Sequence, residues 1–379
     1  MGNIPALPGQ VKIGPRLSRL AGLCLCLLFL PVLGGCAGKR AEDKPAEPTV
    51  SALQYATKLD MRDGRARFRE IYCEISHDHG SEMPDYRPCE QALKLVQPEA
   101  AASGKPVYLG STGSDYLFLV VPGLGWNCFE EWLDHEGSAA KHVASYGYEV
   151  KMVPVDGLSG TEHNAGQIRD YVAGLPEAYA GRPIVLLGYS KGAPDIMTAV
   201  VEYPELASRV VAVVSLAGSV AGSPLAEDAT QDQANLLTKV PGSQCDEGDG
   251  GAVQSLKPAV RQQWLADNPL PQDIRFYTVV TFPDADRISW GLQKSYRLLS
   301  GVDARNDTQV LIYDQMVPGS TLVAFANADH WAIAVPVARS HSFVGSTFVN
   351  RNDYPRELFL EALLRYLEED LAFAVTTSQ

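Results

Sequence analysis

Positive charge is scarce in this chain of 379 residues, which has 32 lysines and arginines against 45 aspartates and glutamates. The formal net charge is −13, and such an acidic balance argues against a nucleic-acid partner. The sequence also lacks internal repeats and low-complexity tracts. Because 46% of the residues are hydrophobic and only 20% are charged, a wholly disordered chain is excluded, and the length suits one large domain with tails.

A hydrophobic run near the N-terminus covers residues 20–33, and it is too short to cross a bilayer comfortably. Three basic residues precede it: Lys12, Arg16 and Arg19. A basic segment followed by a short apolar one is typical of a secretion signal, so residues 1–35 are predicted to be a signal peptide.

The signal ends in the sequence Leu-Gly-Gly-Cys, in which the cysteine is Cys36. This stretch resembles the lipobox of bacterial lipoproteins, in which the cysteine becomes the acylated first residue. The resemblance implies that Cys36 carries a lipid and that the protein lies in the bacterial cell envelope; Ala37 implies the outer membrane, facing the periplasm. A cleaved soluble periplasmic protein and an uncleaved anchor are the alternatives. Residues 36–55, which are small, charged and interrupted by proline, are predicted to be a flexible tether.

Four cysteines remain in the mature chain: Cys73, Cys89, Cys128 and Cys245. An even number in an oxidising compartment favours two disulfides. The local pair Cys73–Cys89 is favoured, which leaves Cys128–Cys245 as the second bond. Three pairings are formally possible, and the sequence does not decide among them.

The small N-terminal segment 56–105 also holds His77 and His79. Together with Cys73 and Cys89 they could form a zinc site. The oxidising compartment favours a disulfide instead, so no metal site is predicted.

Apolar runs of strand length alternate with helix-length segments from residue 107 onwards; the runs are 116–121, 150–155, 184–187, 210–216, 276–281 and 321–325. This alternation predicts an α/β domain over residues 106–379, with a mainly parallel sheet and helices on both faces. About sixty residues separate Leu216 from Phe276. The insertion 219–272 is therefore predicted to be a cap or lid, with a peripheral decoration as the alternative.

The sequence Gly188-Tyr-Ser-Lys-Gly192 follows one of the apolar runs and precedes an amphipathic stretch. This is the Gly-x-Ser-x-Gly nucleophile elbow in its strand–turn–helix setting, which makes Ser190 the candidate nucleophile. The alternative is a glycine-rich turn with an incidental serine. A serine at such a turn is expected to have a strained backbone, and the glycines remove Cβ atoms that would clash.

A serine hydroxyl needs a base, and the chain order expected for this arrangement is Ser, then Asp or Glu, then His. His330 lies just after the apolar run 321–325, in a loop that could return it to the serine, and is predicted to be the base. His341 also follows the serine but has no strand directly before it.

Several aspartates lie between Ser190 and His330, and a resemblance to a known family indicates which of them is the catalytic acid. Residues 300–310, followed by a strand and Asp329-His330-Trp331, resemble bacterial triacylglycerol lipases and esterases of the α/β-hydrolase fold, in which an Asn-Asp-Gly motif supplies the acid. The resemblance implies Asp307 as the acid, although Thr308 stands where the family usually has glycine. Asp314, in an Asp-x-x-Val-Pro stretch, is the alternative acid, and Asp286 is third.

Two backbone N–H groups are expected to bind the oxyanion. One belongs to Lys191, at the helix N-terminus, where the dipole favours negative charge. The other is assigned to Leu124, in a Pro-Gly-Leu-Gly-Trp loop whose position matches the His-Gly-x loop of lipases with proline in place of histidine.

These residues predict an envelope-anchored serine hydrolase that cleaves carboxylic esters through an acyl-enzyme, with no cofactor or metal. A thioesterase, amidase or peptidase of the same fold is one alternative, because a triad fixes acyl transfer but not the leaving group. A hydrolase-like lipoprotein that binds a lipid or a protein partner without turnover is another. The expected partners are an acyl-ester substrate and the membrane, and the sequence identifies no protein partner.

Overall fold

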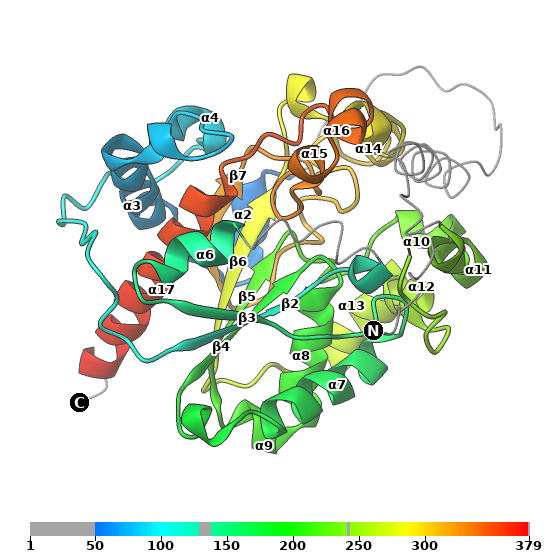
Figure 1. Cartoon of the computed structure of the whole chain (residues 1–379), viewed down its shortest axis with the longest axis horizontal. Coiled ribbons are helices and arrows are strands. Elements are labelled where there is room, and N and C mark those ends of the chain that lie inside the picture. The colour runs from blue at the N-terminus through cyan, green and yellow to red at the C-terminus, as the bar shows by residue number, and fades with distance from the viewer. Residues whose placement is uncertain (1–49, 129–137, 241–242, 378–379) are drawn as a thin grey trace, which may run out of the picture.

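The structure is a computed structural model that describes residues 50–128, 138–240 and 243–377 (Figure 1). Its centre is a seven-stranded sheet of order β1-β7-β6-β5-β4-β2-β3, in which every neighbouring pair is parallel. The strands are β1 (Arg62–Asp63), β2 (Leu117–Val121), β3 (Glu149–Met152), β4 (Ile184–Tyr189), β5 (Val210–Leu216), β6 (Arg275–Thr281) and β7 (Thr321–Ala326). The predicted α/β fold with a parallel sheet is confirmed, and each of the six predicted apolar runs overlaps a strand.

Helices cover both faces of the sheet. On one face lie α3 (Arg65–Asp78), α6 (Ser138–Ala144) and α17 (Arg356–Thr377); on the other lie α7 (Thr161–Ala173), α8 (Gly192–Glu202) and α9 (Pro204–Ala207). Strand β4 shows why both faces need cover: Val185 and Leu187 pack on the first face, and Ile184 and Leu186 on the second. Successive side chains of a strand point to opposite faces, so this apolar run can be buried only between two layers of helices.

The N-terminal segment packs on this domain. It consists of α2 (Ala52–Lys58), strand β1, α3, η2 (Gly80–Glu82) and α4 (Cys89–Ala92). Helix α2 begins after Ser51, whose side chain accepts a hydrogen bond from the Gln54 N–H in a capping box, so the last residues of the expected tether are helical. Residues 1–35, Cys36 and the tether up to residue 49 lie outside the described residues.

The insertion 219–272 folds into short helices: α10 (Leu225–Asp228), α11 (Gln231–Asn235), η5 (Leu236–Lys239), α12 (Ala252–Ser255) and α13 (Pro258–Asp267). The remaining elements are η3 (Trp126–Cys128), η4 (Glu177–Tyr179), η6 (Ala285–Arg287), η7 (Trp290–Leu292), α14 (Gln293–Ser300), α15 (Val337–Ser340) and α16 (Ser342–Thr347). Over the described parts of the chain, no helix combines the length and the apolar character that a membrane span requires.

Two disulfides are present, and they follow the favoured pairing. Cys73–Cys89 joins α3 to the start of α4, within the N-terminal segment. Cys128–Cys245 joins the loop after β2 to the insertion, across a sequence separation of 117 residues. The second bond therefore ties the insertion to the loop that carries Leu124.

Candidate active site

The turn between β4 and α8 holds Ser190 in a left-handed backbone conformation, with φ at 55°. A Cβ added to Gly188 would lie 2.5 Å from Cα of Ala193, and one added to Gly192 would collide with the carbonyl oxygen of Val121. Both positions therefore require glycine, because any side chain would push the helix away from the strands. The backbone has the strain expected of a nucleophile elbow.

His330 lies in the loop after β7, and its Nε2 is 2.8 Å from Oγ of Ser190. The histidine is almost fully buried, at 4% exposed. Two contacts position it: the Tyr189 hydroxyl donates to the His330 carbonyl oxygen at 2.7 Å, and the His330 N–H donates to the Asp307 carbonyl oxygen at 2.8 Å. The position of the imidazole is thus fixed by hydrogen bonds of the His330 backbone as well as by those of its ring.

Asp307 is fully buried, and its carboxylate accepts four hydrogen bonds. Oδ2 lies 2.7 Å from His330 Nδ1 and 2.8 Å from Thr281 Oγ1. Oδ1 accepts from the N–H groups of Gln309 at 3.0 Å and Val310 at 2.8 Å. Because a carboxylate can only accept, this arrangement places the ring proton on Nδ1 and leaves the Nε2 lone pair facing Ser190.

The other candidates for acid and base lie elsewhere. The Asp286 side chain is exposed, in η6. Asp314 makes no hydrogen bond or ion pair with His330 among the described residues; burial raises its pKa to about 7. His341 lies in the wall of the cavity described below. Of the three candidate aspartates, the structure brings Asp307 to the imidazole.

Thr308, which stands where related lipases usually have glycine, has φ at 86°. That is the left-handed region that favours glycine, so the family's preference has a backbone cause. The residue is fully buried, and within the described residues its hydroxyl has no hydrogen-bond partner. Its N–H still donates to Oδ1 of Asn306 at 3.0 Å, which keeps the turn after Asp307 closed.

The loop after β2 packs directly against the nucleophile. A Cβ added to Gly123 would lie 2.9 Å from Cβ of Ser190. In the part of the chain that the structure describes, neither the Leu124 N–H nor the Lys191 N–H donates a hydrogen bond. Both predicted oxyanion donors are therefore unengaged, beside a serine at the N-terminus of α8.

Behind the elbow lies a buried ion pair that the sequence reading did not single out. Lys191 Nζ contacts both carboxylate oxygens of Asp195, at 2.9 and 2.8 Å, and both side chains are almost wholly buried. Burial raises the pKa of Asp195, while the ammonium of Lys191 opposes that shift. Asn164 of α7 donates to the same carboxylate at 2.8 Å. The pair joins the first turn of α8 to α7, and an i, i+4 spacing on a helix was the only signal for it in the sequence.

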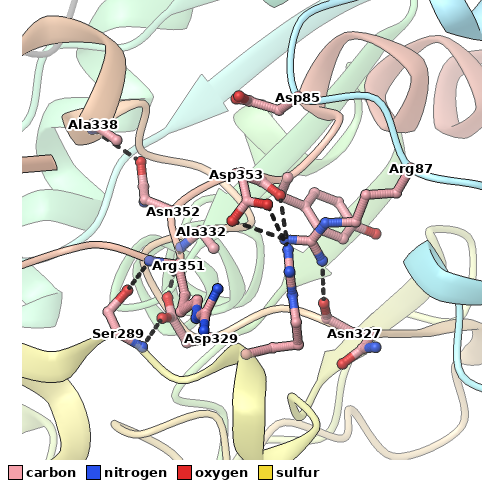
Figure 2. A network of polar contacts seen from close by, with 12 residues as sticks. Asp85, Arg87, Ser289, Asn327, Asp329, Ala332, Ala338, Arg351, Asn352 and Asp353 are labelled. Atoms are coloured by element: carbon pink, nitrogen blue, oxygen red, sulfur yellow. Dashed lines mark hydrogen bonds and ion pairs between the residues drawn. The ribbon is translucent and has the colours of Figure 1, made fainter. Parts of the chain in front are cut away.

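The loop that carries His330 is anchored by a second buried carboxylate, Asp329 (Figure 2). Oδ2 of Asp329 accepts from the Ser289 N–H at 3.0 Å, and Oδ1 accepts from the Ala332 N–H at 2.9 Å. Burial raises the pKa of Asp329, whereas these backbone donors lower it. On the other side of the loop, Arg87 donates to the Asn327 carbonyl oxygen at 3.1 Å. Hydrogen bonds thus fix the chain before His330, at Asn327 and Asp329, and after it, at Ala332.

A cavity of about 310 Å³ opens over Ser190 and His330. The insertion supplies one apolar wall, including Leu225, Leu237, Val253 and Leu256. The segment after His330 supplies the opposite wall, including Trp331, Val335, Val344 and Phe348. In Figure 1, α10 to α12 and the pair α15–α16 form two separate groups of short helices. The part of this wall formed by residues 335–349 was not predicted from the sequence.

Among the residues that the structure describes, those around Ser190 form no cluster suited to a metal ion. In the described ranges, the group of histidine, cysteine or acidic side chains close enough to share an ion lies elsewhere, at His79, His142 and Glu361. The described groups that lie beside Ser190 include the imidazole of His330, with the Asp307 carboxylate behind it, and the loop that carries the Leu124 N–H.

Solved structures share this fold. The metagenomic carboxyl esterase MGS0156 is 37% identical, with a TM-score of 0.78 over 86% of this chain and 97% of that chain. The mature lipase BlEst2 of Bacillus licheniformis is 20% identical, with a TM-score of 0.48 over 64% of this chain and 95% of its own. The Staphylococcus hyicus lipase is 12% identical, with a TM-score of 0.51 over 72% and 99%.

No protein-family model matches the chain, and no curated protein matches it. The family therefore rests on the similarity to the metagenomic carboxyl esterase. At 37% identity over 86% of this chain and 97% of that chain, the match to the metagenomic enzyme is far above what a shared fold alone produces. The chain belongs to the carboxyl esterases of the α/β-hydrolase fold, and it is a carboxylic ester hydrolase.

Proposed function

We propose that the protein hydrolyses esters through a Ser190–His330–Asp307 triad and an acyl-enzyme. The observation that carries the proposal is the continuous chain of contacts from Ser190 Oγ to His330 Nε2 at 2.8 Å and from His330 Nδ1 to Asp307 Oδ2 at 2.7 Å. Nucleophile, base and acid lie in hydrogen-bond reach of one another before any substrate arrives.

In this mechanism His330 Nε2 takes the hydroxyl proton while Ser190 Oγ attacks the ester carbonyl carbon. The negative charge that develops on the carbonyl oxygen is stabilised by the N–H groups of Leu124 and Lys191. His330 then returns the proton to the departing alkoxide, and an acyl-serine remains. Water attacks the acyl group in the same way and regenerates the serine, while the Asp307 carboxylate stabilises the imidazolium in both halves.

The cavity supports an acyl chain of short to medium length as the preferred substrate. Its walls are apolar, and its volume of about 310 Å³ is at the small end for ligand sites. Each methylene that leaves water contributes about 0.8 kcal/mol, so kcat/KM should rise about fourfold per added methylene until the cavity is full. A series of p-nitrophenyl esters from acetate to palmitate measures this. A maximum at palmitate would contradict the volume argument.

The triad is tested by Ser190→Ala. Hydrolysis of p-nitrophenyl butyrate should fall to the level of the buffer blank, with Tm little changed. The matched control is Ser219→Ala, which removes another hydroxyl beside the cavity and should keep activity within a few-fold of the wild type. Retained turnover in Ser190→Ala would refute the assignment. Thioester and amide analogues of the best ester, assayed in parallel, identify the preferred leaving group.

We also propose that Cys36 carries the lipid that anchors the enzyme in the cell envelope. The lipobox resemblance supports this, and Cys36 lies outside the described residues. When the protein is expressed in a bacterium supplied with radiolabelled palmitate, the wild type should incorporate the label and the Cys36→Ser variant should not. Equal labelling of both chains would contradict the proposal.

A further inference from the structure

Helices α3 and α6 both pack on α17 (Figure 1). Three polar side chains from these distant parts of the chain meet there. His79 ends α3, His142 belongs to α6, and Glu361 to α17. The Nε2 atoms of His79 and His142 lie 2.9 and 2.6 Å from the same oxygen, Glu361 Oε2. The side chains are 14%, 11% and 0% exposed, respectively.

The surrounding groups orient this cluster. Arg365 Nε donates to Glu361 Oε1 at 2.8 Å, which leaves Oε2 for the two imidazoles. Nδ1 of His79 lies 3.0 Å from Oδ2 of Asp78. A carboxylate can only accept, so the proton of a neutral His79 sits on Nδ1, and the Nε2 lone pair points at Glu361. The contact of 2.9 Å between His79 Nε2 and Glu361 Oε2 therefore needs either a proton or a metal ion between the two atoms.

We propose that His79, His142 and Glu361 bind a structural Zn²⁺ ion. Two imidazole nitrogens and one carboxylate oxygen form a donor set that zinc favours, whereas Ca²⁺ and Mg²⁺ prefer oxygen alone. The three ligand atoms already lie within 4.8 Å of one another. Tetrahedral bonds of about 2.0 Å separate ligand atoms by about 3.3 Å. The two N–O contacts of 2.9 and 2.6 Å would therefore open by less than about 1 Å, and the two imidazole nitrogens, which lie within 4.8 Å, would approach by at most about 1.5 Å.

Outer groups complete the site. Asp78 behind His79 gives the carboxylate–histidine–zinc arrangement that fixes the tautomer and orientation of a zinc ligand. The Tyr146 hydroxyl, 3.5 Å from His79 Nε2, borders the remaining coordination position, which a water would fill. Arg365 balances part of the charge of Glu361.

The ion would act on stability rather than on turnover. Among the described residues, none of the three ligands contacts Ser190, Asp307 or His330. Instead the ligands come from the N-terminal segment, α6 and the C-terminal helix, so one ion would hold together three segments that the sequence separates by 63 to 282 residues. The inference is independent of the proposed triad.

The test uses the folded protein without a polyhistidine tag, stripped with a chelator and dialysed. Isothermal titration with ZnCl₂ should show one ion per chain, and Tm should rise by about 5 °C at free zinc one hundred times the measured Kd. Co²⁺ in place of zinc should give the intense visible bands of a tetrahedral site. The absence of stoichiometric zinc binding by the wild type would overturn the proposal and leave the cluster as a proton-holding contact.

Variants locate the ion. His142→Ala should lose the zinc-dependent rise in Tm and the cobalt bands while keeping ester turnover, which reports that the chain is folded. His163→Ala is the matched control, because that histidine is exposed and pairs with Asp156 at 3.1 Å away from the cluster. Should His142→Ala fail to fold, His79→Gln gives the same readout. Undiminished zinc binding in a folded ligand variant would refute the site.

Discussion

Replacing Asp307 with asparagine should nearly abolish turnover while leaving the fold intact. The Oδ1 position accepts two backbone N–H groups, from Gln309 and Val310. The amide oxygen must occupy that position, because an NH₂ group there would face two donors. The amide nitrogen then faces His330 Nδ1 and donates to it.

The consequence is a change of tautomer. With Nδ1 accepting, the ring proton moves to Nε2, and the imidazole presents N–H instead of a lone pair to Ser190 Oγ at 2.8 Å. It can then no longer accept the serine proton. The same substitution in a serine protease lowers kcat about 10⁴-fold, equivalent to about 5.5 kcal/mol of transition-state stabilisation, and a loss of that size is expected here.

The assay is kcat and KM for p-nitrophenyl butyrate at neutral pH, together with Tm. We expect kcat to fall about 10⁴-fold and KM to change only a few-fold, since the carboxylate does not line the cavity. Asp314→Asn is the matched control and should keep its activity. A result in which Asp307→Asn keeps a tenth of wild-type kcat, or in which only Asp314→Asn is impaired, would refute the reasoning.

Three further outcomes are expected. Burial raises the pKa of Asp314 to about 7, above its unfolded value of about 3.8. The contribution of this carboxyl to the free energy of unfolding is therefore fully present below about pH 4 and is lost as the pH rises through 7. Asp314→Asn should therefore raise the urea-unfolding free energy at pH 8 by at most about 4 kcal/mol and change it little at pH 3.5; equal effects at both values would contradict this. Gly123→Ala should lower kcat by about 10²-fold or more by displacing the oxyanion loop, whereas Gly113→Ala, whose Cβ meets nothing within 4 Å, should not. Replacing Cys128 and Cys245 by serine should lower the unfolding free energy by about 2–4 kcal/mol, and an unchanged urea midpoint would count against a structural role.

The sheet could be predicted from the sequence because its strands are continuous apolar runs buried on both faces. Strand β1 could not: its two residues, Arg62 and Asp63, are exposed and charged. It forms because the Arg62 N–H finds the Ser320 carbonyl oxygen beside the edge of β7. Such pairing depends on a partner more than 250 residues away and leaves no hydrophobic pattern.

Part of the candidate site could also be predicted from the sequence. Ser190 directly follows β4, His330 lies in the loop after β7, and the carboxyl ends of parallel strands share one edge of a sheet. Chain order alone did not separate Asp307 from Asp314, because both follow the serine and neither ends a strand. The resemblance to lipases favoured Asp307, and the structure brings that carboxylate to the imidazole. Thr281, which donates to the Asp307 carboxylate at 2.8 Å, gave no signal because threonine is ordinary in a strand.

The second wall of the cavity, residues 335–349, escaped prediction because its short helices carry no clear period. The cluster of His79, His142 and Glu361 escaped because histidines in separate helices show no ligand spacing. Both features arise from packing between distant segments. The sequence patterns that succeeded were local ones.

The most direct test of the proposed triad is covalent labelling of the nucleophile. The protein without its signal is treated with a fluorophosphonate, digested and mapped by mass spectrometry. We predict one adduct per chain, on the peptide that carries Ser190, and no adduct in Ser190→Ala. A folded and active enzyme that carries no adduct on Ser190, or that is labelled equally after Ser190→Ala, would contradict the account.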